Sequence, residues 1–300
     1  MSARLVLQAS RRHAWVVPRE TISDASGIER LRVRGAVDLA PGDEVLVDPS
    51  GVVRERLERR SFVRRKTGRG VQVLAANVDD LMVMSAAGLE GGGEGLLARC
   101  IAAAREGGAT PLLVFNKADL DEDGSLERQA GRWERLGFET RVISVLVGTG
   151  IEPLRSRLSG RFVALVGSSG VGKSTLINVL APGASQKTAE VGAGGRGRHT
   201  TTLGRAIPWE GGLLIDLPGL RSFGLVDDAA LHAAYPDIEA AAQGCRFADC
   251  AHGPEPGCGV REAVARGEVE PERLESWRRL RQSIIEGREG GPRPGRAGPR

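Results

Sequence analysis

An eight-residue run, GSSGVGKS at positions 167–174, has the residue types and spacing of a phosphate-binding loop. It follows the apolar residues 162–166, which favour a strand, and opens a stretch that favours a helix, the context this motif requires. Glycines let the backbone approach phosphate oxygens, and N–H groups at a helix N-terminus attract negative charge. The Lys173 amine would bind the β- and γ-phosphates, and the Ser174 hydroxyl would bind Mg²⁺. The predicted site comprises Gly167, Ser168, Ser169, Gly170, Val171, Gly172, Lys173, Ser174 and Thr175.

A second motif, DLPG at 216–219, follows the apolar residues 213–215. A carboxylate at the carboxyl end of a strand is placed to hold a Mg²⁺-bound water, so we assign that role to Asp216. The N–H of Gly219 would then contact the γ-phosphate. A lone D-x-x-G is usually a turn, and it gains weight here from its position downstream of the phosphate loop.

A third motif, NKAD at 116–119, predicts that the base is guanine. Asp119 would accept hydrogen bonds from the ring N–H and the exocyclic amine of guanine, a donor pair that adenine lacks. Asn116 would brace the loop, the stem of Lys117 would cover the base, and backbone N–H groups of residues 144–146 would meet the base carbonyl. Only four of the 42 basic residues are lysines, and two of these four lie in the motifs. The predicted base site comprises Asn116, Lys117, Ala118, Asp119, Ser144, Val145 and Leu146.

The order of these motifs is the reverse of that in Ras-like GTPases, where the phosphate loop comes first. The guanine motif here precedes the phosphate loop, so the chain is circularly permuted. In this respect it closely resembles the RsgA (YjeQ/EngC) family of small ribosomal subunit-dependent GTPases. The resemblance covers nearly the whole chain, including the stretch VLAANVD at 73–79 and GRHTTT at 197–202. It implies an N-terminal OB-fold, a permuted GTPase domain and a C-terminal zinc domain, acting in late maturation of the small subunit.

A cysteine cluster near the C-terminus has the spacing C-x₄-C-x-H-x₅-C. Three thiolates and one imidazole suit tetrahedral Zn²⁺, and four protein ligands leave no open position for water, which indicates a structural site. The spacing also fits the family pattern F-x-D-C-x-H-x-x-E-P-G-C, here residues 247–258. The predicted ligands are Cys245, Cys250, His252 and Cys258.

The residue that would orient the attacking water is not the usual glutamine. Ras-like enzymes carry glutamine directly after D-x-x-G, whereas this chain has Leu220, which neither donates nor accepts a hydrogen bond. We predict that His199, in the Gly- and Arg-rich segment 192–202, takes this catalytic role, and the family resemblance points to the same residue. Among residues 200–202, Thr201 is our choice for the second hydroxyl ligand of Mg²⁺.

The elements that must position these residues fall into three domains. Residues 1–70 hold five short apolar runs separated by Pro, Gly and Asp turns, which predicts a small all-β barrel or sandwich. The family resemblance implies that this part is an OB-fold barrel, to which we assign RNA binding. Residues 71–226 alternate apolar strands with helical stretches, which predicts an α/β permuted P-loop GTPase domain with a mainly parallel sheet. Residues 227–300 combine the cysteine cluster with a helix opening near Pro271 and a basic, partly disordered tail.

Composition and charge exclude several classes of protein. There is no apolar run long enough to span a membrane and no secretory signal, so we expect a cytoplasmic protein, and four cysteines are too few for a disulfide scaffold. The net charge of +4 hides an asymmetry, because residues 1–70 carry 15 basic and 9 acidic side chains and residues 277–300 carry 7 and 2. Two basic ends around an acidic centre favour a polyanionic partner. The family resemblance implies that this partner is the small ribosomal subunit and its RNA, and we expect the protein to be a monomer.

Other interpretations remain open at this point. One is an RNA-binding module that GTP switches on without appreciable turnover. A second is a GTPase that acts away from the ribosome, for example on a membrane or a metal carrier. A third is a P-loop ATPase or kinase.

Overall fold

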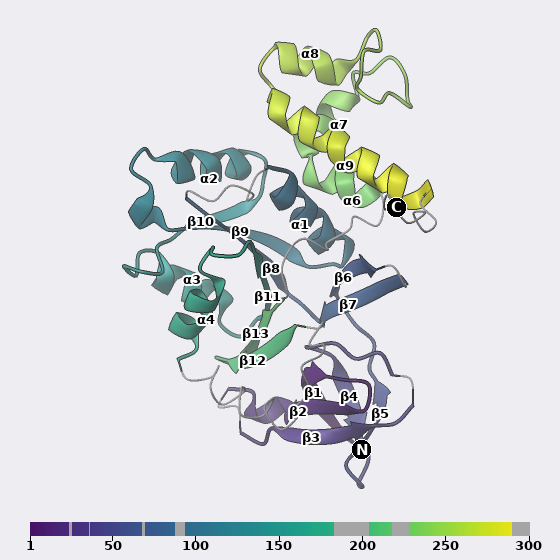
Figure 1. Cartoon of the computed structure of the whole chain (residues 1–300), viewed down its shortest axis with the longest axis vertical. Helices are drawn as coiled ribbons and strands as arrows, with labels where there is room; N and C mark the ends of the chain where they lie inside the picture. The colour runs from purple at the N-terminus through teal and green to yellow at the C-terminus, as the bar shows by residue number, and fades with distance from the viewer. Residues whose placement is uncertain are drawn as a thin grey trace, which may run out of the picture.

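The computed structural model describes residues 1–23, 26–35, 37–67, 70–87, 94–182, 204–217 and 228–289. Along these residues the chain builds a barrel, a central sheet flanked by helices, and a helical C-terminal region, stacked in that order along the long axis (Figure 1). Within the described residues, no helix has the length and apolar character that crossing a membrane requires.

The N-terminal part is a closed five-stranded barrel, as the turn pattern predicts. Its strands are β1 (Ser2–Ala9), β2 (His13–Pro18), β3 (Glu29–Val33), β4 (Glu44–Val47) and β5 (Val52–Arg56). They are ordered β1-β2-β3-β5-β4, and β4 pairs antiparallel with β1 to close the barrel. Alternate side chains face the interior, where Val6, Val16, Val45 and Val53 form a small apolar core.

A two-stranded hairpin connects the barrel to the central sheet. It consists of β6 (Phe62–Thr67) and β7 (Gly70–Ala76), paired antiparallel and separate from both larger sheets. The sequence did not predict this hairpin, because its arginines and its Gly-rich turn obscure the alternation of apolar residues. The domain boundary that we place after residue 70 falls at the start of β7.

The central sheet has six strands in the order β10-β9-β8-β11-β13-β12. The five parallel strands are β8 (Asp80–Ala86), β9 (Thr110–Asn116), β10 (Glu139–Val142), β11 (Phe162–Gly167) and β13 (Gly212–Asp216). The sixth strand, β12 (Arg205–Trp209), is antiparallel and lies at the edge, where the missing N–H of Pro208 is tolerated. Its proline hid it from the sequence analysis.

Helices cover both faces of this sheet, so the predicted doubly wound architecture is confirmed. On one face, α1 (Glu94–Glu106) and α2 (Ser125–Arg135) pack on Leu81, Val83 and Phe115. On the other, α3 (Ile151–Leu158) and α4 (Lys173–Leu180) pack on Met82, Met84 and Val114. Successive side chains along each strand point to opposite faces of the sheet. Because helices cover both faces, the strands are apolar at consecutive positions. Helix α3 was not predicted because it is short and carries Pro153 in its first turn.

The C-terminal region packs its helices against α1. It comprises α6 (Asp228–Ala234), α7 (Pro236–Ala242), α8 (Gly259–Ala265) and α9 (Pro271–Glu289), and both α6 and α9 contact α1. Helix α9 begins at the predicted proline, and its apolar residues Leu274, Trp277, Leu280 and Ile284 are buried. The cysteine cluster lies in the irregular loop between α7 and α8, at the far end of the molecule from the barrel (Figure 1).

Candidate nucleotide and metal sites

The phosphate loop joins the carboxyl end of β11 to the N-terminus of α4, as predicted. The side chain of Val171 is buried and anchors the loop to the core. A Cβ on Gly167 would lie 2.8 Å from the Cγ1 atom of Val171, which is too close for any residue other than glycine. Gly172 caps α4 with a φ of 95°, in the left-handed region that favours glycine. Ser174 and Thr175 are exposed on the first turn of the helix. The loop therefore presents helix N–H groups and hydroxyls to solvent, as an anion site requires.

Asn116 joins the base motif to the phosphate loop. Its Nδ2 atom donates to the carbonyl of Val171 over 2.8 Å, and its Oδ1 atom accepts from the N–H of Val145 over 3.1 Å. The side chain is 97% buried, since only 3% of its surface is exposed. A Cβ on Gly172 would lie 2.3 Å from Nδ2, so the glycine is needed for this close approach. One amide thus holds together three segments that are distant in the sequence.

Around the predicted base site, two loops hold the carboxylate of Asp119 in place. Lys117 adopts a left-handed conformation with a φ of 66°, and the N–H of Ala118 donates to the carbonyl of Ile143 over 3.1 Å. The hydroxyl of Ser144 donates to the carboxylate of Asp119. The sequence analysis gave Ser144 only a backbone role, and its side-chain role was missed because no local pattern reports a contact across 25 residues.

Of the backbone N–H groups predicted to meet the base carbonyl, two already have partners. The N–H of Ser144 donates to Thr149 over 3.0 Å, and that of Val145 donates to Asn116. Within the described part of this loop, the N–H of Leu146 has no protein acceptor. The side chain of Leu146 is 82% exposed.

At the phosphate end of the site, Lys173 and Asp216 pair with each other. The amine of Lys173 contacts the carboxylate of Asp216 and also lies 3.4 Å from the carbonyl of Leu217. The strands β11 and β13 are hydrogen-bonded neighbours, which brings the two predicted residues together at the carboxyl edge of the sheet. Three other predicted residues, His199, Thr201 and Gly219, lie outside the described residues, as does Leu220.

The predicted metal ligands converge in the loop between α7 and α8, which we call the metal loop (residues 243–258). The ligand atoms of Cys245, Cys250, His252 and Cys258 all lie within 4.8 Å of one another. The Nδ1 atom of His252 is 3.6 Å from the sulfurs of both Cys245 and Cys258, and these sulfurs are 4.0 Å apart. Ligand bonds of about 2.0–2.3 Å in a tetrahedron require separations of this size. The cluster is compatible with a structural metal.

Helix α9 supports the metal loop from one side. The ring of Trp277 lies 4.8 Å from the imidazole of His252, centroid to centroid, and the guanidinium of Arg278 donates to the His252 carbonyl. His252 has a φ of 58°, so its backbone conformation is unfavourable for most residues and is held by these neighbours. The imidazole is therefore oriented before any ion binds.

Comparison with known proteins adds a family to this geometry. The family model described as RsgA GTPase matches residues 56–226, more than half of the chain. The chain belongs to the RsgA GTPase family. This confirms the resemblance inferred from the order of the motifs, and it identifies the protein as a GTPase.

Relatives and solved structures agree with the family assignment. Two proteins named small ribosomal subunit biogenesis GTPase RsgA are each 39% identical to the chain, one from Mesorhizobium japonicum and one from Vibrio cholerae. The alignments cover 81% and 87% of this chain and 73% and 70% of the relatives. The crystal structure of YjeQ from Thermotoga maritima superposes with a TM-score of 0.70 at 24% identity, covering 95% of this chain and 98% of that one. The crystal structure of YloQ, a circularly permuted GTPase, superposes with a TM-score of 0.67 at 23% identity, covering 98% of this chain and 97% of that one. At these identities the likeness to both structures supports the fold.

Proposed function

We propose that this RsgA-family GTPase acts in biogenesis of the small ribosomal subunit, hydrolysing GTP in residues 71–226 while residues 1–70 and 227–300 bind ribosomal RNA. The observation that carries the GTP site is the Asn116 amide, which joins the base loop to the phosphate loop despite their reversed order. The ribosomal role rests on the names of relatives that are 39% identical over most of their length.

GTP binding requires Lys173 to exchange one anionic partner for another. In the structure its amine contacts Asp216, and the β- and γ-phosphates would take the place of that carboxylate. Asp216 would then be free to hold a Mg²⁺-bound water, with the Ser174 hydroxyl as a direct ligand. Mg²⁺ supplies charge neutralisation at the phosphates when it is bound. The same exchange makes binding of the nucleotide and of the ion mutually dependent.

Guanine recognition rests on the oriented carboxylate of Asp119. The hydroxyl of Ser144 occupies one carboxylate oxygen, and the geometry leaves the exposed side of the group for the base. The N–H of Leu146 is the backbone donor that would meet the base carbonyl, and the Leu146 side chain would shield this contact from water. For hydrolysis we propose His199 as the group that orients water and Thr201 as a second Mg²⁺ ligand.

RNA binding by the barrel is supported by exposed arginines in β3, directly before β2 and directly after β3. His13 lies opposite Arg32 and Trp15 lies opposite Arg30, and all four side chains are on the outer face of the strands. The guanidinium of Arg30 lies 5.3 Å from the centre of the Trp15 ring. The exposed arginines of this region form no ion pair with any described residue; they are Arg11, Arg12, Arg30, Arg32 and Arg34. This is the face that OB-folds use for oligonucleotides.

The C-terminal domain would contribute through the basic side chains of α9, held in place by the metal loop. We propose Zn²⁺ as the resident ion, with Cys245, Cys250, His252 and Cys258 as its ligands. Three thiolates favour this ion over Mg²⁺ or Ca²⁺, which prefer oxygen. When bound, the ion cross-links a loop that has no strand or helix of its own among residues 243–258.

The decisive experiment measures steady-state GTP hydrolysis with and without purified small ribosomal subunits. We expect slow turnover by the protein alone and stimulation by small, but not large, subunits. Lys173→Ala should abolish both rates, which separates this GTPase from a contaminating one. Equal rates with and without subunits would overturn the ribosomal role, and undetectable phosphate release would favour a GTP-switched binding module.

Further variants test guanine recognition and RNA binding by the barrel. Asp119→Asn should weaken GTP binding and admit xanthosine triphosphate, because the amide presents a donor where the carboxylate accepts. Arg30→Ala/Arg32→Ala should weaken small-subunit binding and reduce the salt slope of log Kd by about 1–2. The control pair is Arg19→Ala/Arg54→Ala, which removes the same charge from barrel arginines that are already paired with Glu44 and Asp48.

A further inference from the structure

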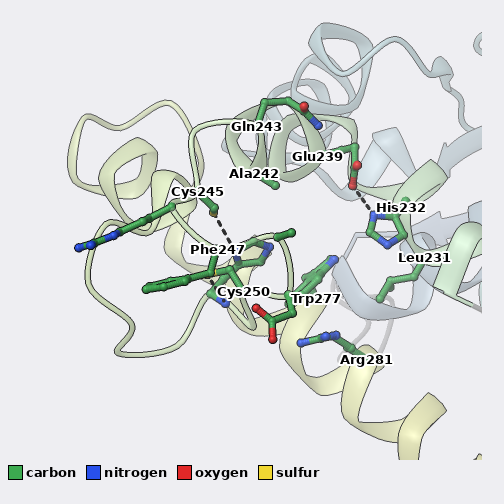
Figure 2. A pocket seen from close by; sticks show the side chains of 14 residues that line it. Leu231, His232, Glu239, Ala242, Gln243, Cys245, Phe247, Cys250, Trp277 and Arg281 are labelled. Carbon is green, nitrogen blue, oxygen red and sulfur yellow. Dashed lines mark hydrogen bonds and ion pairs between the residues drawn. The ribbon is translucent and has the colours of Figure 1, made fainter.

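A pocket of about 550 Å³ opens beside the metal loop, between this loop, α7 and the middle of α9. Leu231 and Glu239 line it from α6 and α7, Phe247 and Asp249 from the metal loop, and Trp277 and Arg281 from α9 (Figure 2). Its volume lies in the range of pockets that hold a small organic group. Cys245, Cys250 and His252 also line the pocket, so it adjoins the predicted metal site, while the nucleotide site does not extend into it.

Phe247 is the first notable feature of the pocket. Its side chain is 43% exposed, and it is the one Phe, Trp or Tyr among the described residues that ranks as exposed. Its carbonyl accepts a hydrogen bond from the N–H of Cys250 over 3.3 Å, so the backbone shapes the metal loop. The ring takes no part in that contact and ligates nothing. The loop therefore presents aromatic surface of Phe247 to solvent at the edge of the pocket.

Two cations border the ring and the floor of the pocket. The guanidinium of Arg246 lies 5.5 Å from the centre of the Phe247 ring, and that of Arg281 lies 5.3 Å from the centre of the Trp277 ring. Neither arginine forms an ion pair with any residue in the described ranges. The acidic Glu239 is already in contact with His232, which leaves Asp249 as the other carboxylate of the lining.

This combination specifies the chemistry of a ligand. An exposed ring offers a stacking face, Gln243 and Asp249 offer hydrogen-bonding groups elsewhere in the lining, and guanidinium groups without an ion-pair partner among the described residues favour anions. A free inorganic anion would make no use of the ring, and an aliphatic side chain would make no use of the arginines. A nucleobase attached to its phosphates uses all three. Bases within a duplex are already stacked, so the ligand must be unpaired.

We propose that this pocket binds an unpaired RNA base, which stacks on Phe247 while Arg246 and Arg281 bind the flanking phosphates. The proposal rests on the proposed function and extends it, because it assigns RNA contact to the metal loop as well as to the barrel and α9. RNA binding would then also depend on the metal, because the ion fixes the loop that carries Phe247.

The test compares Phe247→Leu with Phe247→Tyr in the full-length, zinc-loaded protein. The probe is a single-stranded RNA that carries 2-aminopurine, whose fluorescence is quenched on stacking, with the same RNA annealed to its complement as the paired control. Stacking of one base contributes about 5- to 150-fold in affinity. We expect Phe247→Leu to lose affinity in that range together with the quenching, and Phe247→Tyr to retain both. The annealed RNA should show neither difference.

Controls separate a lost stacking face from a damaged fold. Zinc content and unstimulated GTP hydrolysis should match the wild type in both variants, and Val179→Ala, an exposed apolar truncation on α4, should leave RNA affinity unchanged. Arg281→Ala provides a second variant outside the metal loop. It should weaken RNA binding, but the 2-aminopurine fluorescence should stay partly quenched because Phe247 is still present. Equal RNA affinity of Phe247→Leu and wild type would overturn the pocket alone, whereas a wild type that binds no RNA would overturn the proposed function. Unchanged RNA affinity with weaker binding to intact subunits would assign the pocket to a protein and also overturn the proposal.

Discussion

The barrel and the C-terminal region are joined to the nucleotide domain in different ways. At the barrel, the joint is built mainly from hydrogen bonds to backbone groups, two of them made by the side chain of Asn77. The Nδ2 atom of Asn77 donates to the carbonyl of Gly42 over 2.9 Å, its Oδ1 atom accepts from the N–H of Arg60 over 3.0 Å, and the N–H of Ala76 donates to Pro41 over 2.8 Å. A Cβ on Gly42 would lie 2.1 Å from the carbonyl oxygen of Ala76, so the two parts approach closely.

At the C-terminal region, the joint is built from side chains that are far apart in sequence. Arg273 on α9, with 2% of its side chain exposed, contacts Glu94 on α1 and Asp237 on α7. The guanidinium lies between the rings of Trp133 and Tyr235, 5.1 and 4.8 Å from their centres. Burial opposes its charge, but the hydrogen bond with Asp237 and the charge of Glu94 outweigh this effect and raise the pKa of Arg273.

The difference indicates how each end responds to change. A joint in which most groups belong to the backbone holds one geometry and depends on few side chains, chiefly Asn77. A joint centred on one buried guanidinium depends on that group, because removing it takes the same partner from Asp237 and from Glu94, which keeps only the more distant Arg132 at 3.7 Å. We therefore expect the placement of the barrel to be robust and that of the C-terminal region to be sensitive to single substitutions.

Metal removal should give the largest contrast between the two ends. Structural Zn²⁺ sites contribute on the order of 10 kcal/mol of apparent folding free energy in zinc-finger peptides at pH 7. Chelation, or Cys258→Ser, should unfold the metal loop and loosen α8, while the barrel retains its strand hydrogen bonds. Hydrogen exchange followed by mass spectrometry resolves the two regions. Loss of protection in the barrel as well would show that its stability depends on the C-terminal region.

Arg273→Ala should have the next largest effect. Breaking a buried ion pair by removing one partner costs about 3–5 kcal/mol, and here two carboxylates lose the same partner. The free energy of unfolding in urea and the protease sensitivity of α9 measure this loss. Arg266→Ala is the matched control, because Arg266 pairs with Glu268 on the surface, where solvent screens the pair and its loss should change the free energy of unfolding little. Equal effects of the two substitutions would contradict the central role of Arg273.

The contrast between the joints also explains what the sequence could reveal. Local patterns predicted the five barrel strands, the parallel strands, the phosphate loop and the metal ligands, since each depends on neighbours within a few residues. The contact of Arg273 with Glu94 spans 179 residues, and that of Asn116 with Val171 spans 55. Such pairs leave no periodic signal, so the joint and the bridge within the nucleotide site became visible only in three dimensions.

Asn77→Ala should have a smaller effect than Arg273→Ala. It leaves the carbonyl of Gly42 and the N–H of Arg60 without partners, at about 1–3 kcal/mol for a buried group. Asn77 also has a φ of 55°, which alanine tolerates poorly. Asn77→Gly separates the two contributions, because glycine keeps the conformation and loses the hydrogen bonds. Differential scanning calorimetry of both variants should show a lower Tm, with alanine lower than glycine if backbone strain contributes.

The smallest effect concerns pH, and it belongs to the barrel face that carries His13, Arg30 and Arg32 rather than to either joint. Burial, together with the charges of Arg30, Arg32 and Arg12, lowers the pKa of His13 below its ordinary value of 6.5. A lowered pKa in the folded state means that protonation favours unfolding, so the stability contributed above pH 6.5 declines as the pH falls through the folded pKa.

Binding of RNA to this face should reverse that shift. Phosphates beside Arg30 and Arg32 neutralise the charges that disfavour protonation, so the pKa of His13 should rise and a proton should be taken up on binding. An NMR titration of the His13 imidazole with and without single-stranded RNA measures the change, and His13→Gln should remove the accompanying pH dependence of affinity. An unchanged pKa in the presence of bound RNA would place the RNA on another face and leave the unpaired arginines without a ligand.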